Sequence, residues 1–213
     1  MLPRVYFHTM AEYYKYAAAH GVSAMYAEAY PNWGEGPKLY VALKLQWDPD
    51  LNVDQLIHEW YEAAVGKKAA PYLAAYYRLW EEFWTDRVLV GEWFTRKKKM
   101  QYLYFGWPKY LDLVTFEDME NSRALLEIAS ENVETKGEKA RIQYLLKAFE
   151  FYEASALSYL GFKKGMRQAG KKSAYYHMLN KRRYELVEKF DNDSVLKHPL
   201  RFDSKRFSEG FAW

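Results

Sequence analysis

Apolar side chains recur three and four residues apart along most of this 213-residue chain. This spacing places them on one face of an α-helix, so the pattern predicts a mainly α fold. The expected architecture is a helical bundle or array with at most one or two short strands. The expected helices span residues 10–20, 37–47, 53–65, 68–87, 115–134, 138–160 and 171–191.

Capping and breaking residues set the ends of several of these helices. Thr9 and Glu12 have the spacing of a capping box, and Asn52 can cap the helix that begins at residue 53. Gly66 and Gly161 each follow the end of an expected helix, where glycine is favoured. Further start signals are Pro37 and, after Thr115, the acidic residues Glu117 and Asp118.

Aromatic residues make up 19% of the chain, and their helical spacing predicts that most of them lie in the core. Trp47 is expected to close the apolar face of its helix. An aromatic stripe at helical spacing lies in the core more often than it forms a ligand-binding surface. The two clearest stripes are Tyr72, Tyr76, Trp80 and Phe83, and then Ile142, Leu145, Phe149, Tyr152 and Ala156.

One segment departs from the helical period. Residues 22–27 are partly β-branched and aromatic, and they predict a short buried strand. Residues 28–36 contain Pro31, Gly34 and Gly36, which predict a loop. This loop leads directly into the expected helix at residues 37–47, which gives a strand–loop–helix unit.

Composition excludes several kinds of site. The chain has no cysteine, which excludes disulfides, thiolate metal sites and cysteine nucleophiles. It contains no apolar run of about 18 residues and no signal-peptide pattern, so we expect no membrane partner. These features leave the localisation undetermined.

The net charge of +3 is unevenly distributed. Residues 1–135 carry 14 basic and 19 acidic side chains, whereas residues 136–213 carry 17 basic and 9 acidic ones. A basic region can bind nucleic acid, but a solvated helical face is the more common explanation. No known nucleic-acid module accompanies this region, so a nucleic-acid partner is not expected. Its basic and aromatic residues include Lys163, Lys164, Lys171, Lys172, Lys181, Arg182, Arg183, Tyr175, Tyr176 and Tyr184.

Several short words along residues 5–160 resemble the C-terminal half of the DUF4838 proteins, a family of bacterial glycoside-hydrolase-like chains. The resemblance is strongest over residues 20–85 and fades beyond residue 165. The words are Ala27-Glu28-Ala29-Tyr30, Asn32-Trp33-Gly34, Leu39-Tyr40-Val41, Lys44-Leu45-Gln46-Trp47-Asp48-Pro49 and Val65-Gly66 followed by Ala69-Ala70.

The resemblance implies a parent protein in which a (β/α)8 barrel precedes a helical domain. That helical domain resembles the C-terminal regions of α-glucuronidases and hexosaminidase-like enzymes. The resemblance implies a terminal β/α unit of the barrel at residues 1–50, followed by a helical domain at 51–191. Pro199 and Gly210 predict an irregular tail at 192–213. We therefore expect the C-terminal portion of a carbohydrate-active glycoside hydrolase, with part of a sugar cleft but without a complete catalytic site.

Glu28 is the best candidate for a catalytic residue, and Glu35 is the second. Glu28 would follow the expected strand, and barrel enzymes place functional side chains at the C-terminal ends of strands. Glycosidases need two carboxyl groups, about 5–5.5 Å apart for retention or about 6.5–9.5 Å apart for inversion. We expect the working pair to lie upstream of this chain. Glu35 has a structural alternative, because a carboxylate is favoured before a helix N-terminus.

The same loop supplies the candidate substrate-binding residues Glu28, Tyr30, Asn32 and Trp33. Aromatic faces such as those of Tyr30 and Trp33 can stack on sugar rings, and Asn32 can hydrogen bond to sugar hydroxyls. Trp33 has an equally good alternative as an apolar lid.

The sequence predicts neither a metal site nor a cofactor. The five histidines are scattered and have no ligand partner at helical spacing. No phosphate-binding loop, dinucleotide-binding glycine pattern or nucleophile elbow is present. Two hypotheses remain for function: a sugar-cleft component of a hydrolase that binds a glycan, or an all-helical interaction or assembly module without catalytic activity. A lone strand would expose its edges, so we also expect self-association through the N-terminal region.

Overall fold

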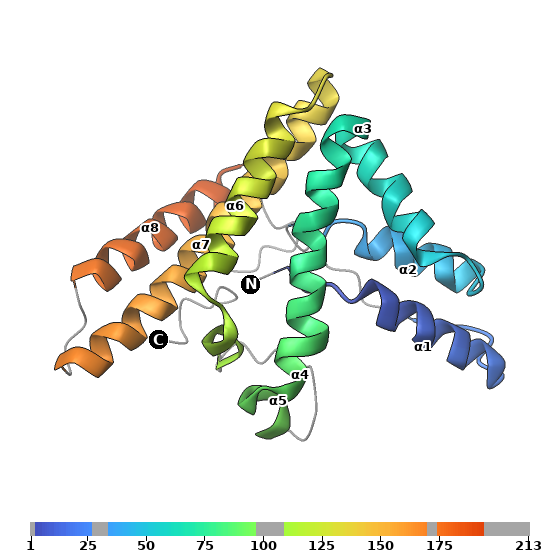
Figure 1. The fold of residues 1–213 in the computed structure, drawn as a ribbon, viewed down its shortest axis with the longest axis horizontal. Helices are drawn as coiled ribbons and strands as arrows, with labels where there is room; N and C mark the ends of the chain where they lie inside the picture. Colours follow the sequence, from blue (N-terminus) through green and yellow to red (C-terminus); the bar gives the residue numbers. More distant parts are fainter. Residues whose placement is uncertain (1–2, 27–33, 97–108, 170–173, 194–213) are drawn as a thin grey trace. The chain divides into compact units, whose positions relative to one another are not determined.

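The computed structural model describes residues 3–26, 34–96, 109–169 and 174–193. Within these ranges every regular element is a helix, which confirms the predicted mainly α fold (Figure 1). The elements are α1 (Phe7–Ala19), α2 (Lys38–Trp47), α3 (Val53–Glu82), the π-helical turn η1 (Phe83–Arg87), α4 (Val88–Val90), α5 (Glu92–Arg96), the 3-10 turn η2 (Lys109–Leu113), α6 (Phe116–Glu131), α7 (Lys136–Ala169) and α8 (Ala174–Asp191).

The described residues divide into two compact units. Unit 2 comprises Pro3–Thr85 and Asn121–Leu145, and unit 1 comprises Asp86–Glu120 and the residues from Leu146 onward. The division predicted from sequence, at residues 1–50, 51–191 and 192–213, stays a prediction. Its first boundary falls inside unit 2, because α1 and α2 both pack on α3.

In unit 2, α1 begins at Phe7, two residues before the expected capping box, and ends at Ala19, two residues before Gly21. Tyr6 is its N-cap and makes no side-chain capping bond, so the predicted role of Thr9 is wrong. A distant carboxylate replaces it, because Glu81 Oε1 accepts the backbone N–H of His8 at 2.9 Å. This bond satisfies one of the N–H groups that a helix start leaves unpaired.

The expected strand at residues 22–27 does not form over its described part. Residues 22–26 are irregular and largely exposed, and Val22 has 46% of its surface accessible. A strand needs a neighbour that pairs with its backbone N–H and C=O groups. No strand occurs among the described residues, so local β-propensity has nothing to pair with.

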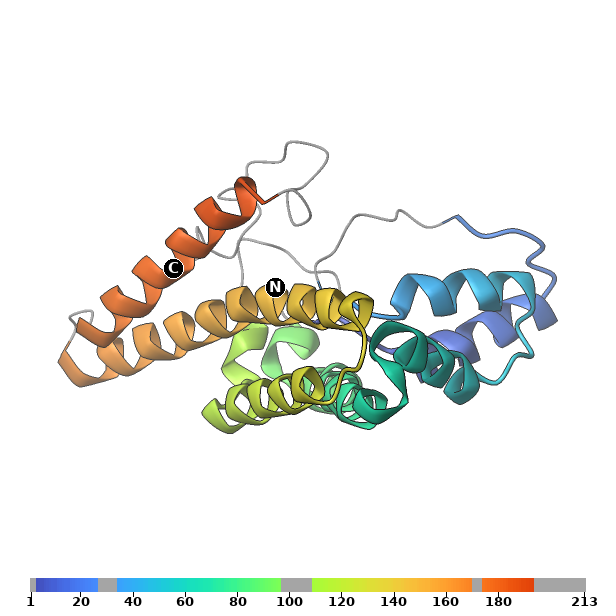
Figure 2. The ribbon, with the colours of Figure 1, turned by 90° about the horizontal axis from the view of Figure 1, so that it is seen from above.

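Helix α2 lies beside α1 and starts after Pro37, as predicted (Figure 2). Val41 and Leu45 form its buried face, and Gln46 Nε2 donates to the Tyr14 hydroxyl of α1 at 3.0 Å. Trp47 does not close this face, because 92% of its surface is exposed. Its position follows from the helical period, since residue 47 lies two positions after Leu45 and therefore points away from the core.

Helix α3 consists of two arms that meet at Gly66. Asn52 Oδ1 accepts the Gln55 N–H at 3.1 Å, which confirms the predicted cap of the first arm. Gly66 has φ +80° and ψ 163°, so the chain leaves the helix there and starts a second arm at once. The expected stripe is buried at Tyr76 and Trp80 of the second arm and at Phe83 of η1, whereas Tyr72 is partly exposed.

Helix α7 confirms its expected apolar face but not its expected end. All five residues of that face are buried. The helix runs through Gly161 to Ala169, over 34 residues. A glycine inside a helix costs only about 1 kcal/mol relative to alanine. The packing of so long a helix outweighs that cost, and Gly161 itself is buried.

In unit 1, the start of α6 is held by a reciprocal cap and an ion pair. The Thr115 hydroxyl accepts the Asp118 N–H at 3.0 Å, and Asp118 Oδ2 accepts the Thr115 N–H at 2.8 Å. Both carboxylate oxygens also accept from Arg87, each at 2.9 Å. Burial alone would raise the pKa of Asp118, but its bonds to Arg87 and Thr115 outweigh burial and lower the pKa.

Replacing Asp118 with asparagine should destabilise unit 1 by about 2 kcal/mol, because one carboxylate accepts bonds from a guanidinium and a backbone N–H. Since the folded pKa lies below its ordinary value of 3.8, the contribution is complete at neutral pH and is lost as the pH falls through the folded pKa. Urea unfolding of wild type and Asp118→Asn from pH 7 to pH 2 checks this. The exposed neighbour Glu117→Gln is the control, and an equal effect of both variants would contradict the role of Asp118.

Candidate functional site

The candidate site centres on the loop of residues 28–36. Its predicted substrate-binding residues Glu28, Tyr30, Asn32 and Trp33 lie outside the described residues. The structure describes both flanks of the loop and the second catalytic candidate, Glu35. The geometry of these flanks therefore defines what the loop is attached to.

The C-terminal flank of the loop is fixed to a buried tyrosine of α3. The Tyr77 hydroxyl donates to the backbone carbonyl of Gly34 at 2.9 Å, and both residues are buried. Gly36 lies directly against the same ring: a Cβ at this position would come within 2.3 Å of Tyr77 Cζ. Gly36 also has φ +57°, so both its conformation and its close contact favour glycine. We call Gly34, Gly36 and Tyr77 the loop base.

An aromatic cluster surrounds the ring of Tyr77 and holds it in place. The rings of Tyr61 and Tyr77 stack with centroids 5.8 Å apart, and Phe7 and Trp60 meet Tyr77 edge to face at 6.4 and 6.3 Å. These residues come from α1 and from both arms of α3. The loop base is therefore part of the core of unit 2 and is not a surface turn.

Glu35 lies in this base as an ion-paired residue. Its Oε2 is 2.8 Å from Lys38 Nζ, and both side chains are largely covered, with 18% and 22% of their surface exposed. The Lys38 ammonium also lies 5.3 Å from the centre of the Tyr6 ring. Glu35 therefore has a cationic partner in the first residue of α2, and its catalytic and helix-start roles stay predictions.

The extended segment before α1 adds polar and aromatic groups beside Tyr6. The Trp84 indole N–H donates to the Pro3 carbonyl at 2.6 Å. The Arg4 guanidinium lies 5.9 Å from the Tyr6 ring centre and 5.8 Å from that of Trp84. A cation near the face of an aromatic ring is attracted to it. Arg4 and Lys38 thus both lie beside the Tyr6 ring, and Arg4 also lies beside the fully buried Trp84.

The N-terminal flank of the loop is exposed. Residues 22–24 are exposed, and Tyr26 has 88% of its surface accessible. The loop thus starts from an exposed segment and ends on a buried support.

A second group of polar residues, which sequence reasoning missed, lies at the start of α1. The His8 ring is 3.0 Å from Glu81 Oε2 through Nδ1 and 3.2 Å from Asp54 Oδ1 through Nε2. Partial burial alone would lower the pKa of His8, but the two carboxylates outweigh it and raise the pKa above 6.5. Glu81 is 73 positions from His8, so no local sequence pattern could have revealed the contact.

The described residues provide no evidence for a metal site, a membrane-spanning helix or a continuous basic face. Among the described residues no group of three or more His, Cys, Asp or Glu side chains is arranged to hold a metal ion. No helix in that part of the chain is long and apolar enough to cross a membrane. The expected basic face is interrupted, because Lys163 pairs with Asp112 and Arg183 is 1% exposed. Lys164, Lys171, Lys172, Tyr175 and Tyr176 lie outside the described side chains.

The close contact at the loop base predicts different costs for two glycines with left-handed backbones. Gly36→Ala should destabilise unit 2 by about 3 kcal/mol or more, because backbone strain adds to a clash with the Tyr77 ring. Gly21→Ala should cost only the strain, about 1–2 kcal/mol, since no atom lies within 4 Å of its added Cβ. Urea unfolding of both variants checks the difference. Equal costs would show that the Tyr77 ring yields freely.

Part of the chain matches a known protein family. No curated protein and no solved structure matches the chain. One family model, described as a domain of unknown function (DUF4838), matches residues 1–78. This range contains the whole candidate loop, its base, and the residues Arg4, Tyr6 and Lys38 beside it. The family resemblance found in the sequence is therefore confirmed for residues 1–78, which are a DUF4838 match.

Proposed function

We propose that this chain is part of a carbohydrate-active, glycoside-hydrolase-like protein and contributes one wall of its sugar cleft. The observation that carries the proposal is the bond from the buried Tyr77 hydroxyl to the Gly34 carbonyl. It ties a loop rich in sugar-binding residue types to a rigid core, and ligand contacts are effective when their support is rigid. The DUF4838 match over residues 1–78 supports the family resemblance on which this proposal draws.

Each loop residue has a role in this proposal. Trp33 and Tyr30 offer aromatic faces to a sugar ring, and Asn32 offers one donor and one acceptor group to its hydroxyls. Glu28 accepts sugar hydroxyls or serves as one member of a carboxyl pair. The ion pair of Glu35 with Lys38 makes it a weak candidate for the other member. The proposal therefore gives this chain a binding wall rather than a complete catalytic pair.

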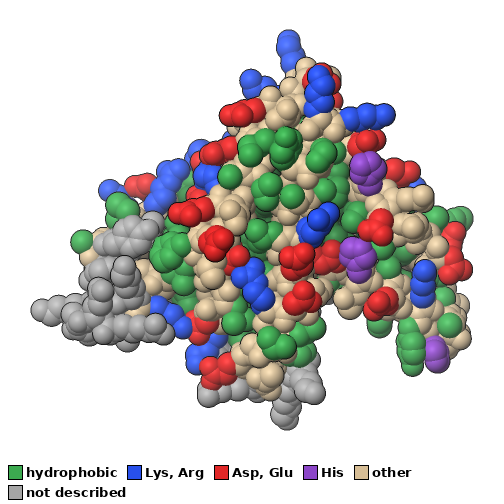
Figure 3. Space-filling view, viewed as in Figure 1, with side chains coloured by type: hydrophobic (Ala, Val, Ile, Leu, Met, Phe, Trp, Pro, Cys, Tyr) green, Lys and Arg blue, Asp and Glu red, His purple; other side chains and the backbone are tan. Residues whose placement is uncertain are grey.

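An interaction module is the second candidate, and an exposed apolar stripe on α2 favours it. Leu39, Leu43 and Trp47 lie one helical turn apart and have 51%, 58% and 92% of their surfaces exposed. Two tyrosines of the neighbouring α1, Tyr13 and Tyr16, are also exposed. Figure 3 shows apolar side chains reaching the surface between charged ones on the face drawn there. Contiguous exposed apolar surface often marks a contact with another protein.

The sugar-cleft proposal predicts binding of oligosaccharides without turnover. The 213-residue chain is assayed for hydrolysis of aryl glycosides and for binding of plant oligosaccharides, beside Glu28→Gln, Trp33→Ala and Tyr77→Phe. We expect no turnover, weak binding that Trp33→Ala abolishes, and reduced binding in Tyr77→Phe because the loop loses its support. The control is Trp47→Ala, which removes an exposed tryptophan outside the loop.

Three outcomes of this assay lead to different conclusions. Turnover that Glu28→Gln abolishes would mean that a complete site exists within the chain. Equal loss of binding in Trp33→Ala and Trp47→Ala would indicate nonspecific aromatic adhesion. Absence of both binding and turnover would reject the sugar-cleft proposal and favour the interaction module.

The interaction-module candidate predicts association of the chain with itself through the N-terminal region. Light scattering behind size-exclusion chromatography should give a mass above 25.4 kDa, and Leu43→Glu should reduce that mass to the monomer value. Val90→Glu is a matched control, since Val90 is 82% exposed in unit 1. A monodisperse monomer at high concentration would count against self-association.

A further inference from the structure

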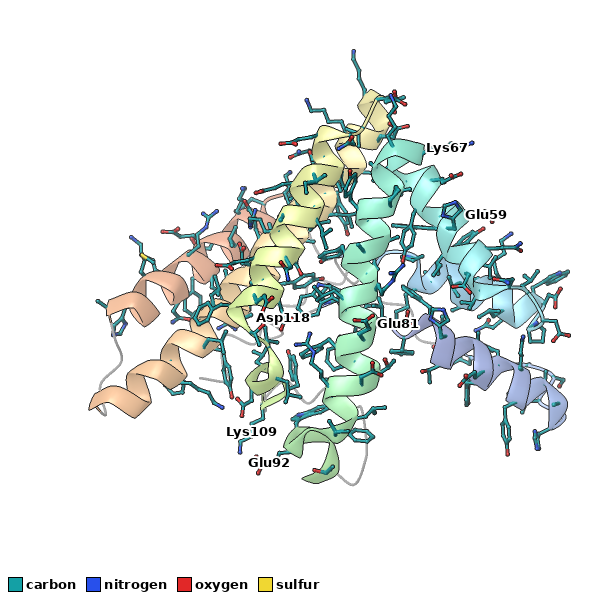
Figure 4. All side chains as sticks on the ribbon, viewed as in Figure 1. Glu59, Lys67, Glu81, Glu92, Lys109 and Asp118 are labelled. Carbon is teal, nitrogen blue, oxygen red and sulfur yellow. The ribbon has the colours of Figure 1, made fainter. Side chains whose placement is uncertain are left out.

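We propose that His8 is a pH-dependent clamp: its doubly protonated ring holds both arms of α3, and loss of one proton releases the first arm at Asp54. The clamp consists of His8 in α1, Asp54 in the first arm and Glu81 in the second. In Figure 4, the labelled Glu81 lies on the second arm of α3 where the start of α1 meets it. All three residues belong to unit 2.

The two contacts of the His8 ring require a proton on each ring nitrogen. Nδ1 of His8 is 3.0 Å from one carboxylate oxygen and Nε2 is 3.2 Å from another. An ionised carboxylate can only accept hydrogen bonds, and a neutral imidazole has one N–H group. Both contacts can therefore be hydrogen bonds only when the ring is an imidazolium. The neutral ring leaves one nitrogen lone pair facing a carboxylate.

Burial decides which contact breaks first. The Glu81 side chain is 11% exposed, whereas that of Asp54 is 74% exposed. Glu81 also keeps the backbone N–H of His8, which does not titrate. A carboxylate in water loses little when its partner leaves, but a buried one loses much more. The neutral ring should therefore donate to Glu81 and let Asp54 return to water.

The ionisable groups near the clamp, other than its three members, lie first on α1 and α3. On α1, the next acid after His8 is Glu12, one turn further along. On α3, the buried Tyr61 has its pKa raised first by burial and then by Glu81, so it stays protonated throughout the relevant range. Arg78 acts on Tyr61 in the opposite sense.

The third element, α2, carries two cations, Lys38 and Lys44, and both have partners of their own. Lys38 pairs with Glu35, and Lys44 lies 5.5 Å from the Tyr40 ring centre. The titration that matters is therefore that of His8 between its two acids. Since the folded pKa is raised above 6.5, the clamp is complete below that pH and is lost as the pH rises through the folded value.

Release of Asp54 should affect the end of the first arm that lies furthest from Gly66. Gly66 joins the arms with a non-helical backbone, and the stacked rings of Tyr61 and Tyr77 hold them near the middle. Asp54 lies in the first turn of the first arm, next to the Asn52 cap. Release of Asp54 should therefore loosen this first turn while the aromatic cluster stays packed.

Two measurements on the full chain test the clamp. NMR titration of the histidine rings, with His8 assigned from His8→Gln, should give a His8 pKa above 6.5 that falls in Asp54→Asn. Hydrogen exchange should then show the first turn of α3 opening about two- to five-fold more in His8→Gln than in wild type at a pH below the His8 pKa. The two proteins should converge at a pH above it.

His58→Gln is the matched control, because His58 lies on the same arm and its Nε2 is 3.3 Å from Glu62 Oε1, one turn along that arm. It should leave the exchange of the first turn unchanged. Asp54→Asn changes an exposed residue and should keep the fold even if His8→Gln does not. A His8 pKa at or below 6.5, or a pKa that Asp54→Asn does not change, would overturn the clamp.

Discussion

The backbone of Gly66 is the constraint on which unit 2 depends. Its left-handed φ ends one helical arm and starts the next without a loop, so Tyr61 of the first arm stacks on Tyr77 of the second. The turn leaves carbonyl groups at the end of the first arm without helical partners, and Arg141 of α7 donates to the Ala64 carbonyl at 2.6 Å. The carboxylate of Glu138 packs where a Cβ would project, within 2.9 Å, while it caps the start of α7 through Thr135 and Glu134. One glycine therefore fixes both the two-armed helix and the helix that covers its apex.

The turn at Gly66 also brings together the residues that hold Tyr77, the buried support of the candidate loop. Because the arms fold back on each other, Tyr77 is enclosed by aromatic rings from α1 and from both arms, and its hydroxyl is left to hold Gly34. The loop then continues through Gly36 into α2, whose first residue, Lys38, binds Glu35. A buried hydroxyl that donates to a backbone carbonyl is costly to break, since both groups would remain unpaired. The support of the loop is therefore as stable as the core itself.

Local signals in the sequence predicted the fold better than they predicted the site. Asn52, Gly66 and Thr115 act within a few residues of their partners, so the ends that they set were found from spacing alone. The strand at residues 22–27 was wrong over its described part, because strand formation depends on a distant partner that local propensity does not reveal. The same limit hid the contacts of His8 with Asp54 and Glu81, which lie 46 and 73 positions away. For Glu35, the sequence offered both a catalytic role and a role at a helix start, but it did not reveal the ion pair with Lys38.

The DUF4838 match covers less of the chain than unit 2 does, and this difference bears on function. The match ends at residue 78, within the second arm of α3. Contacts that complete this part come from beyond it: Trp84 binds the Pro3 carbonyl, Glu81 binds the first turn of α1, and Arg141 binds Ala64. A loop that recognises a ligand needs its supporting groups to be fixed as well as its contact residues. The helical residues outside the match are thus part of what positions the candidate loop, and a function carried by residues 28–36 depends on them.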